Sequence, residues 1–281
     1  MNGPDQTATL PHVRIEPASG WFDLDLAELW RFRDLMLVLM LRDVKLRYRQ
    51  TALGVIWVVL QPLVAGLIFA LIFGRFAGLP SEGIPYLPYA FAALLPWNLF
   101  AGSVQRAGNS LVSDARLIQK VYFPRMLIPI ASCGAVLVDF LVSFVVMLVM
   151  LAIYSFAPGW RLLMLLPLLL LALVVSLGVS LFFSALNVHY RDFMYALPFV
   201  VQVWLYLSPV VYSPSLIPER LRPLFELNPL VGLIEGFRWA LLGGRPFPAA
   251  ALTASLVTGV LLFLCGALVF NRVERNFADV V

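Results

Sequence analysis

Charged residues are scarce in this chain of 281 residues. Only 13% of them are Asp, Glu, Lys or Arg, whereas 61% are hydrophobic and the mean hydropathy is +0.89. A soluble domain carries roughly a quarter of charged residues. This composition therefore excludes an ordinary soluble protein and indicates a protein of the lipid bilayer.

Cysteine and histidine are nearly absent. Cys133 and Cys265 both lie inside apolar stretches, where they act as small hydrophobic residues and support neither a disulfide framework nor a metal site. His12 and His189 are too few and too far apart for metal-assisted or acyl-transfer chemistry within a membrane. This disfavours a membrane-embedded glycosyltransferase or acyltransferase, and we expect no bound metal.

The chain also lacks a nucleotide site. Its two lysines, Lys45 and Lys120, follow Val44 and Gln119, so neither completes the P-loop pattern, which places glycine before lysine. The chain is therefore predicted not to be an enzyme, to hold no cofactor and to be unable to power transport alone. The basic residues, which give a pI near 9.3, cluster beside apolar spans and not on a soluble face, so nucleic acid is not an expected partner.

The chain contains several long uncharged stretches. About 20 residues in a helix cross the ~30 Å hydrocarbon core of a bilayer. The stretches predict an all-α integral membrane protein with six transmembrane helices, at approximately 52–74, 86–106, 126–156, 162–186, 193–212 and 249–271. Residues 23–281 then form one membrane domain, preceded by a polar N-terminal arm at 1–22 that does not resemble a signal peptide.

Basic residues predict the orientation of these spans. With the N-terminus in the cytoplasm, six basic residues lie outside, at Arg75, Arg161, Arg220, Arg222, Arg238 and Arg245. The other 14 of the 20 then lie inside, as the positive-inside rule requires. We expect a multi-pass protein with both termini in the cytoplasm.

Three segments outside the spans have characters of their own. Residues 23–49 alternate apolar and charged side chains and predict an amphipathic helix along the cytoplasmic surface. Residues 109–125 predict a short amphipathic cytoplasmic helix. Residues 213–245 hold proline-bounded apolar pieces too short to cross, which predicts re-entrant helices dipping from the outer face.

The segment 109–125 is a candidate docking site for a partner protein. An amphipathic helix can place its apolar face in a partner's groove, although an ordinary solvated helix has the same pattern. The candidate docking residues are Leu111, Val112, Arg116, Leu117, Ile118, Lys120, Val121 and Tyr122.

Two aromatic stripes and one acid within the spans are candidates for a substrate path. At about 100° per residue, Tyr86, Tyr89, Trp97 and Phe100 fall within about 80° of arc, and Tyr195, Phe199, Gln202 and Tyr206 within about 60°. Aromatic faces suit sugar rings, but such stripes also serve helix packing or the interfacial belt. Asp139, the one ionisable residue well inside a span, belongs either to the conduit or to a buried hydrogen-bonded or ion-paired structure.

Several motifs, in order along residues 35 to 281, resemble the membrane subunits of bacterial ABC polysaccharide exporters, the O-antigen, capsule and teichoic-acid group. They are Arg42 to Gln50 with Leu53, Gly54, Trp57 and Pro62; Pro96 to Phe100; Leu117 to Arg125 with Pro129; Asn187 to Asp192; Asn228 to Leu230; and Glu274 to Val280. Ala93 departs from the family pattern, which has glycine there in many members.

The resemblance implies a homodimer in the bacterial inner membrane, paired with two copies of a separate ATP-binding subunit that binds ATP and Mg²⁺. It implies export of a lipid-linked polysaccharide from the cytoplasmic side, with the outer re-entrant helices gating the exit. An ABC exporter permease for a drug or lipid shares the six-span plan. It would not be expected to combine the Arg42 to Tyr48 and Glu274 to Asp279 patterns.

Overall fold

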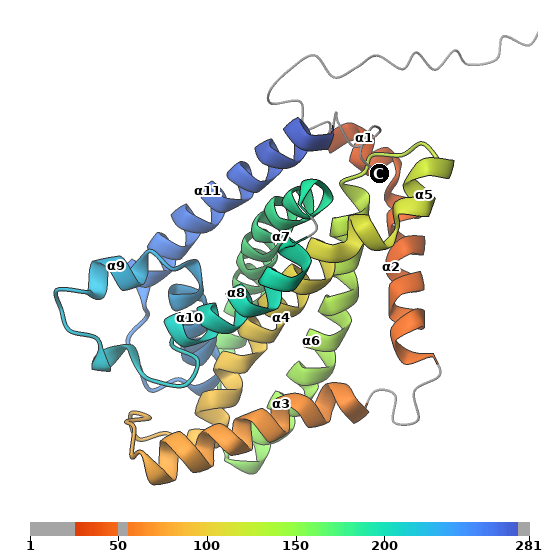
Figure 1. Cartoon of the computed structure of the whole chain (residues 1–281). Coiled ribbons are helices and arrows are strands. Elements are labelled where there is room, and N and C mark those ends of the chain that lie inside the picture. The colour runs from red at the N-terminus through yellow and green to blue at the C-terminus, as the bar shows by residue number, and fades with distance from the viewer. Residues whose placement is uncertain (1–25, 50–55, 191, 275–281) are drawn as a thin grey trace, which may run out of the picture.

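The computed structural model describes residues 26–49, 56–190 and 192–274, and these residues form helices and turns without a strand (Figure 1). The polar arm at 1–22 lies outside the described residues, as does most of the closing motif after Glu274. The all-helical prediction is thus confirmed for the part of the chain that is described.

Five helical segments are long and apolar enough to cross a membrane. They are Ile56–Phe76 (α3, Ile56–Phe69, continued by a π-helical stretch at Ala70–Phe76), Tyr86–Ser113 (α4), Leu127–Ile153 (α6), Gly159–His189 (a 3-10 turn at Gly159–Met164 and α7 at Leu165–His189) and Ala249–Glu274 (α11). The predicted fifth span, 193–212, contains α8 at Phe193–Leu207. At 1.5 Å per residue, α8 is shorter than the ~30 Å hydrocarbon core, and so the sixth span is not confirmed.

Helix α4 forms the centre of the bundle. It packs against α3, α6, α7, α8 and α10 (Pro229–Leu242), and most of its side chains are buried. Helices α7 and α11 pack along one another at close range. A Cβ atom at Gly178 would lie 2.5 Å from the Cα of Phe263, so glycine is needed where these two helices meet.

One end of the molecule, called here the α5 end, gathers four short or terminal pieces. They are α1 (Leu26–Arg31), the first part of α2 (Arg33–Tyr48), α5 (Ala115–Lys120) and the C-terminal part of α11. A hydrophobic cluster that includes Leu39, Leu127 and Phe270 holds them together. The guanidinium of Arg125 also donates to the Glu274 carbonyl at 2.9 Å. The opposite end, called the α9 end, carries α9 (Arg222–Glu226).

Two segments differ from their expected form. The predicted docking helix 109–125 is divided: α4 continues to Ser113, the chain turns at Asp114, and α5 covers six residues. The two apolar pieces expected in 213–245 are one continuous helix, α10, buried against α4, α7 and α11. Continuity is possible because Glu235 and Arg238, which separate the pieces in sequence, form an ion pair at 2.9 Å one turn apart.

The motif Asn228 to Leu230 has a structural role at the start of α10. The Asn228 side chain caps the helix by accepting from the Leu230 backbone N–H at 3.1 Å, and Pro229 follows as the first helical residue. The Asn228 side chain also accepts from the Trp204 indole at 3.1 Å and donates to the Ser208 hydroxyl at 3.0 Å. Asn228 therefore fixes the end of α8 to the start of α10.

Candidate functional site

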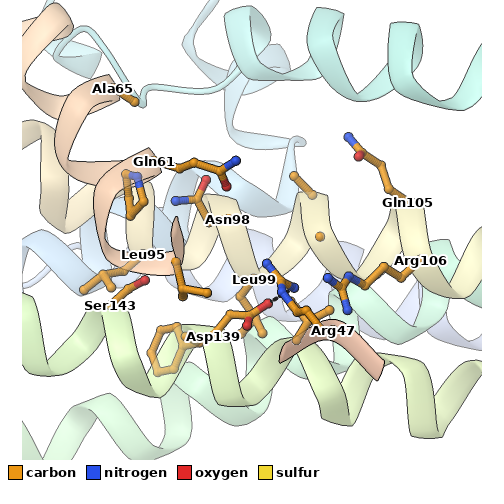
Figure 2. Close-up of a pocket in the computed structure, with 16 residues that line it drawn as sticks. Arg47, Gln61, Ala65, Leu95, Asn98, Leu99, Gln105, Arg106, Asp139 and Ser143 are labelled. Atoms are coloured by element: carbon orange, nitrogen blue, oxygen red, sulfur yellow. Dashed lines mark hydrogen bonds and ion pairs between the residues drawn. The ribbon is translucent and has the colours of Figure 1, made fainter. Parts of the chain in front are cut away.

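A cavity of about 450 Å³ lies between the end of α2 and the helices α3, α4 and α6 (Figure 2). Its apolar wall includes Val58, Leu95, Leu99 and Phe140. Its polar wall comprises Arg47, Gln61, Asn98, Gln105, Arg106, Asp139 and Ser143. A polar cavity bounded by three apolar helices is unusual, since polar side chains at membrane depth face protein or water and mark candidate ligand sites.

Asp139 has a defined partner in this cavity. Arg47 donates a hydrogen bond to Asp139 Oδ2, and the Tyr48 hydroxyl donates to Oδ1 at 2.7 Å. Burial and then the hydrogen bond to Asp139 raise the pKa of Tyr48 to about 12, so this hydroxyl stays protonated as a donor. Asp139 is thus part of an ion pair that joins α2 to α6, and it also lines the cavity.

A second ion pair holds α2 at the α5 end. The Arg42 guanidinium donates to Asp43 at 2.8 Å and to Asp114 at 2.6 Å, and Asp114 is the residue at which the chain turns between α4 and α5. Burial alone would lower the pKa of Arg42, but the hydrogen bonds to Asp114 and Asp43 outweigh it and raise the pKa above its ordinary value. The basic motif beginning at Arg42 therefore has a structural use in addition to any role in topology.

The predicted docking residues divide between two faces. Leu111 is buried, and Leu117 and Ile118 pack against the hydrophobic cluster of the α5 end. The exposed members are Val112, Arg116, Lys120, Val121 and Tyr122. Within the described chain, this exposed set forms the accessible surface of the segment, whereas Leu117 and Ile118 attach the segment to its own subunit.

The two aromatic stripes lie in opposite environments. On α4, Tyr89, Trp97 and Phe100 are 0%, 5% and 1% exposed. The fourth member, Tyr86, is half-buried, and its hydroxyl donates to the Val211 carbonyl. The α4 stripe is therefore enclosed within the subunit.

On α8, in contrast, Tyr195, Phe199 and Tyr206 are 76%, 71% and 64% exposed. Gln202 is also exposed and donates to the Tyr206 hydroxyl at 3.3 Å. The α8 stripe thus forms an aromatic face that no other part of the described chain covers.

A further ionic cluster, which the sequence did not predict, lies near the α9 end. Arg238 is fully buried, lies 3.7 Å from the centre of the Tyr89 ring and donates to Glu235 at 2.9 Å. Arg245 joins the other oxygen of Glu235, at 2.8 Å, to Glu82, at 2.6 Å. The only sequence signal was the spacing of Glu235 and Arg238 inside an apolar run. This cluster connects the 77–85 loop, α4 and α10, and thus serves as a lock between elements.

Comparison with known proteins gives a consistent result. The model of the ABC-2 type transporter family matches residues 34–242. The O-antigen export system permease protein RfbA of Myxococcus xanthus is 31% identical over 256 residues, which cover 90% of this chain and 97% of the relative. RfbA of Klebsiella pneumoniae is 29% identical, covering 88% and 95% of the two chains, and the polysialic acid transport protein KpsM of Escherichia coli is 25% identical, covering 84% and 92%.

The family match covers most of this chain and includes the α2 helix, the cavity helices α3, α4 and α6, both stripes and α10. The similarity extends over nearly the full length of each relative, so it is not limited to one shared fragment. The chain therefore belongs to the ABC-2 type transporter family of multi-pass membrane proteins.

Proposed function

We propose that the chain is the permease subunit of an ATP-driven exporter that moves a polysaccharide across the bacterial inner membrane. The observation that carries this proposal is the similarity to export permeases named for O-antigen and polysialic acid over 84% to 90% of this chain. The two lysines of the sequence complete no P-loop, which agrees with a permease that relies on a separate ATPase.

The proposed assembly is a homodimer of permeases with two copies of the ATP-binding subunit, carrying a lipid-linked glycan. The proposed contact with the ATPase is the exposed surface formed by Arg116 and Lys120 on α5 and by Val121 and Tyr122, which follow it. An apolar pair flanked by basic residues suits an acidic-rimmed apolar groove. The uncovered aromatic face of α8 is the proposed wall of the glycan path, completed by a second subunit.

The proposed topology places the α5 end in the cytoplasm. Support comes from the 14 basic residues that this orientation keeps inside and from the position of α1, α5 and the end of α11 at one end of the bundle. In this topology, α8 with the following residues to 212 makes the sixth crossing, and α9 and α10 dip from the outer face. Helix α2 begins at the cytoplasmic surface and runs along α6 as far as Asp139.

Export can be tested in the source bacterium by deleting the gene and measuring surface polysaccharide. We expect surface polysaccharide to fall, glycan to accumulate on the cytoplasmic side, and the wild-type gene to restore both. Normal surface polysaccharide in the deletion strain, together with a loss of drug or lipid efflux, would favour the alternative exporter class. In the purified system, we expect no ATP hydrolysis by this chain alone and hydrolysis after assembly with its ATPase; robust activity of the chain alone contradicts the proposal.

A further inference from the structure

The polar wall of the α3, α4 and α6 cavity has more hydrogen-bonding groups than internal partners. Gln61, Asn98 and Ser143 line the cavity, yet their side chains form no hydrogen bond with another residue that the structure describes (Figure 2). Each amide side chain has two donors and an acceptor. The side chains of Gln61, Asn98 and Ser143 are therefore available to a polar ligand.

The charges of the cavity do not balance. Arg47 is paired with Asp139, whereas Arg106 forms no ion pair within the described part of the chain. Arg106 interacts at longer range with the charges of Arg47, Asp139 and Asp43. The lining thus holds two cations and one anion. A cation that is partly removed from water and lacks a partner is costly, and a bound anion would offset that cost.

One wall of the cavity is also a helix with an exposed apolar side. Helix α3 turns Val58, Gln61 and Pro62 toward the cavity, while its other side exposes a continuous apolar set, namely Ile56, Trp57, Leu60, Val64, Leu67 and Ile68. No other part of the described chain covers this second side, so hydrocarbon can reach it in a bilayer. A molecule with an anionic head and an apolar tail could therefore place its head in the cavity and its tail along α3.

We propose that this cavity binds the phosphate group of a membrane lipid, with Arg106 as the principal cation and the Gln61 and Asn98 amides as further donors. A guanidinium with its fork of N–H groups matches phosphate oxygens, and about 450 Å³ lies in the range of small-molecule sites. Asp139 keeps Arg47 occupied, so Arg106 is the cation available to the ligand. The inference concerns a lipid site in the wall of the subunit and does not depend on which molecule is exported.

The test uses the full-length chain, purified in detergent and stripped of bound lipid, with two probes that differ only in the phosphate: dioleoyl phosphatidic acid and dioleoylglycerol. Native mass spectrometry measures the affinity of each. We expect phosphatidic acid to bind about tenfold more tightly or better, as a charge-assisted hydrogen-bonded pair implies. Arg106→Gln should reduce the preference to within about twofold, and Arg106→Lys should retain most of it.

Arg116→Gln, at an exposed arginine outside the cavity, is the matched control and should keep the full preference. Equal binding of the two probes by the wild-type chain, a measurement that needs no variant, overturns the proposal. So does a full preference in a folded Arg106→Gln protein. Inorganic phosphate, added as a competitor, distinguishes the sources: affinity equal to that of phosphatidic acid means a free-anion site and refutes the lipid assignment. Export measured in cells is a separate readout, so loss of this site would leave the proposed function standing.

Discussion

Helices α4 and α8 carry nearly the same sequence feature, but they differ in how far it is exposed. Each has an aromatic arc on one face, but Trp97 and Phe100 of α4 are 5% and 1% exposed, whereas Phe199 and Tyr206 of α8 are 71% and 64% exposed. A helical period identifies which side chains share a face. It does not identify what that face contacts, and this difference separates packing from a candidate surface.

The reason lies in how each helix is surrounded. Helix α4 packs against α3, α6, α7, α8 and α10, so most of its side chains are buried. Helix α8 packs on α4 with one side only, through buried Leu197 and Val201 and through Trp204, whose ring lies 5.0 Å from that of Phe100. The aromatic side of α8 therefore stays exposed in the described chain. A contiguous apolar face of this kind marks a surface for a second subunit or a ligand.

The largest expected effect is a difference in stability between alanine variants of α4 and of α8. Trp97→Ala removes a large buried ring from the bundle centre and should cost about 3 to 5 kcal/mol of unfolding free energy. Phe199→Ala, the matched change on α8, should cost less than about 1 kcal/mol, because the ring is mostly exposed. Thermal unfolding of the purified variants measures both. Equal losses for the two would mean that α8 is packed as tightly as α4 within the subunit.

The segment 109–125 shows the same contrast between a buried and an exposed side chain, at Leu117 and Val121. Leu117→Asp places a charge against the hydrophobic cluster of the α5 end and should destabilise the fold by about 2 kcal/mol. Val121→Asp, on the exposed side, should leave stability unchanged yet prevent co-purification with the ATPase. Gel filtration and co-purification from the same preparation report both. Full recovery of ATPase with a folded Val121→Asp protein would place the contact elsewhere.

A good part of the architecture could be predicted from the sequence, because apolar runs and helix length are local properties. The long helices follow from them. The helix expected along the cytoplasmic surface differs from its prediction, because α2 packs along α6 as far as Asp139. Partners distant in sequence could not be predicted. Asp139 meets Arg47, which lies 92 residues away, and Glu235 meets Arg245 near a fully buried Arg238. Such pairs form only when helices pack, and no spacing rule reveals them.

The same limit applies to the turn after α4. The sequence predicts a helix over 109–125 because apolar and basic residues alternate there. Helix α4 instead continues to Ser113 and breaks at Asp114, whose carboxylate is held by Arg42 from α2. A distant arginine thus helps to set a local boundary. The orientation, the sixth crossing and the partners remain proposals, because they depend on a membrane and on other chains.

An intermediate effect is expected at Asp139, an acid within an otherwise apolar span. Asp139→Asn keeps the shape of the side chain but removes the charge that Arg47 pairs with. The cost should be about 1 to 2 kcal/mol, less than for a fully buried pair because both side chains retain some exposure. Asp34→Asn is the control at an exposed acid and should not change thermal stability. An unchanged melting temperature for Asp139→Asn would show that the pair contributes nothing to the attachment of α2.

The smallest expected effect is on the export rate of variants of the α8 aromatic face. If the α8 face contacts the moving glycan, Tyr195→Ala, Phe199→Ala and Tyr206→Ala should each remove stacking area worth about 1 kcal/mol, which is about fivefold in export per folded complex. Stability should hold, because these rings are exposed in the subunit. Leu207→Ala, at an exposed aliphatic side chain on the same helix, controls for loss of area without an aromatic ring and should leave export near the wild-type rate. The rate is measured in vesicles containing the permease with its ATPase and is normalised to assembled complex. If the three variants lose dimer and not rate, the face joins subunits; if they lose neither, the glycan path runs along other helices.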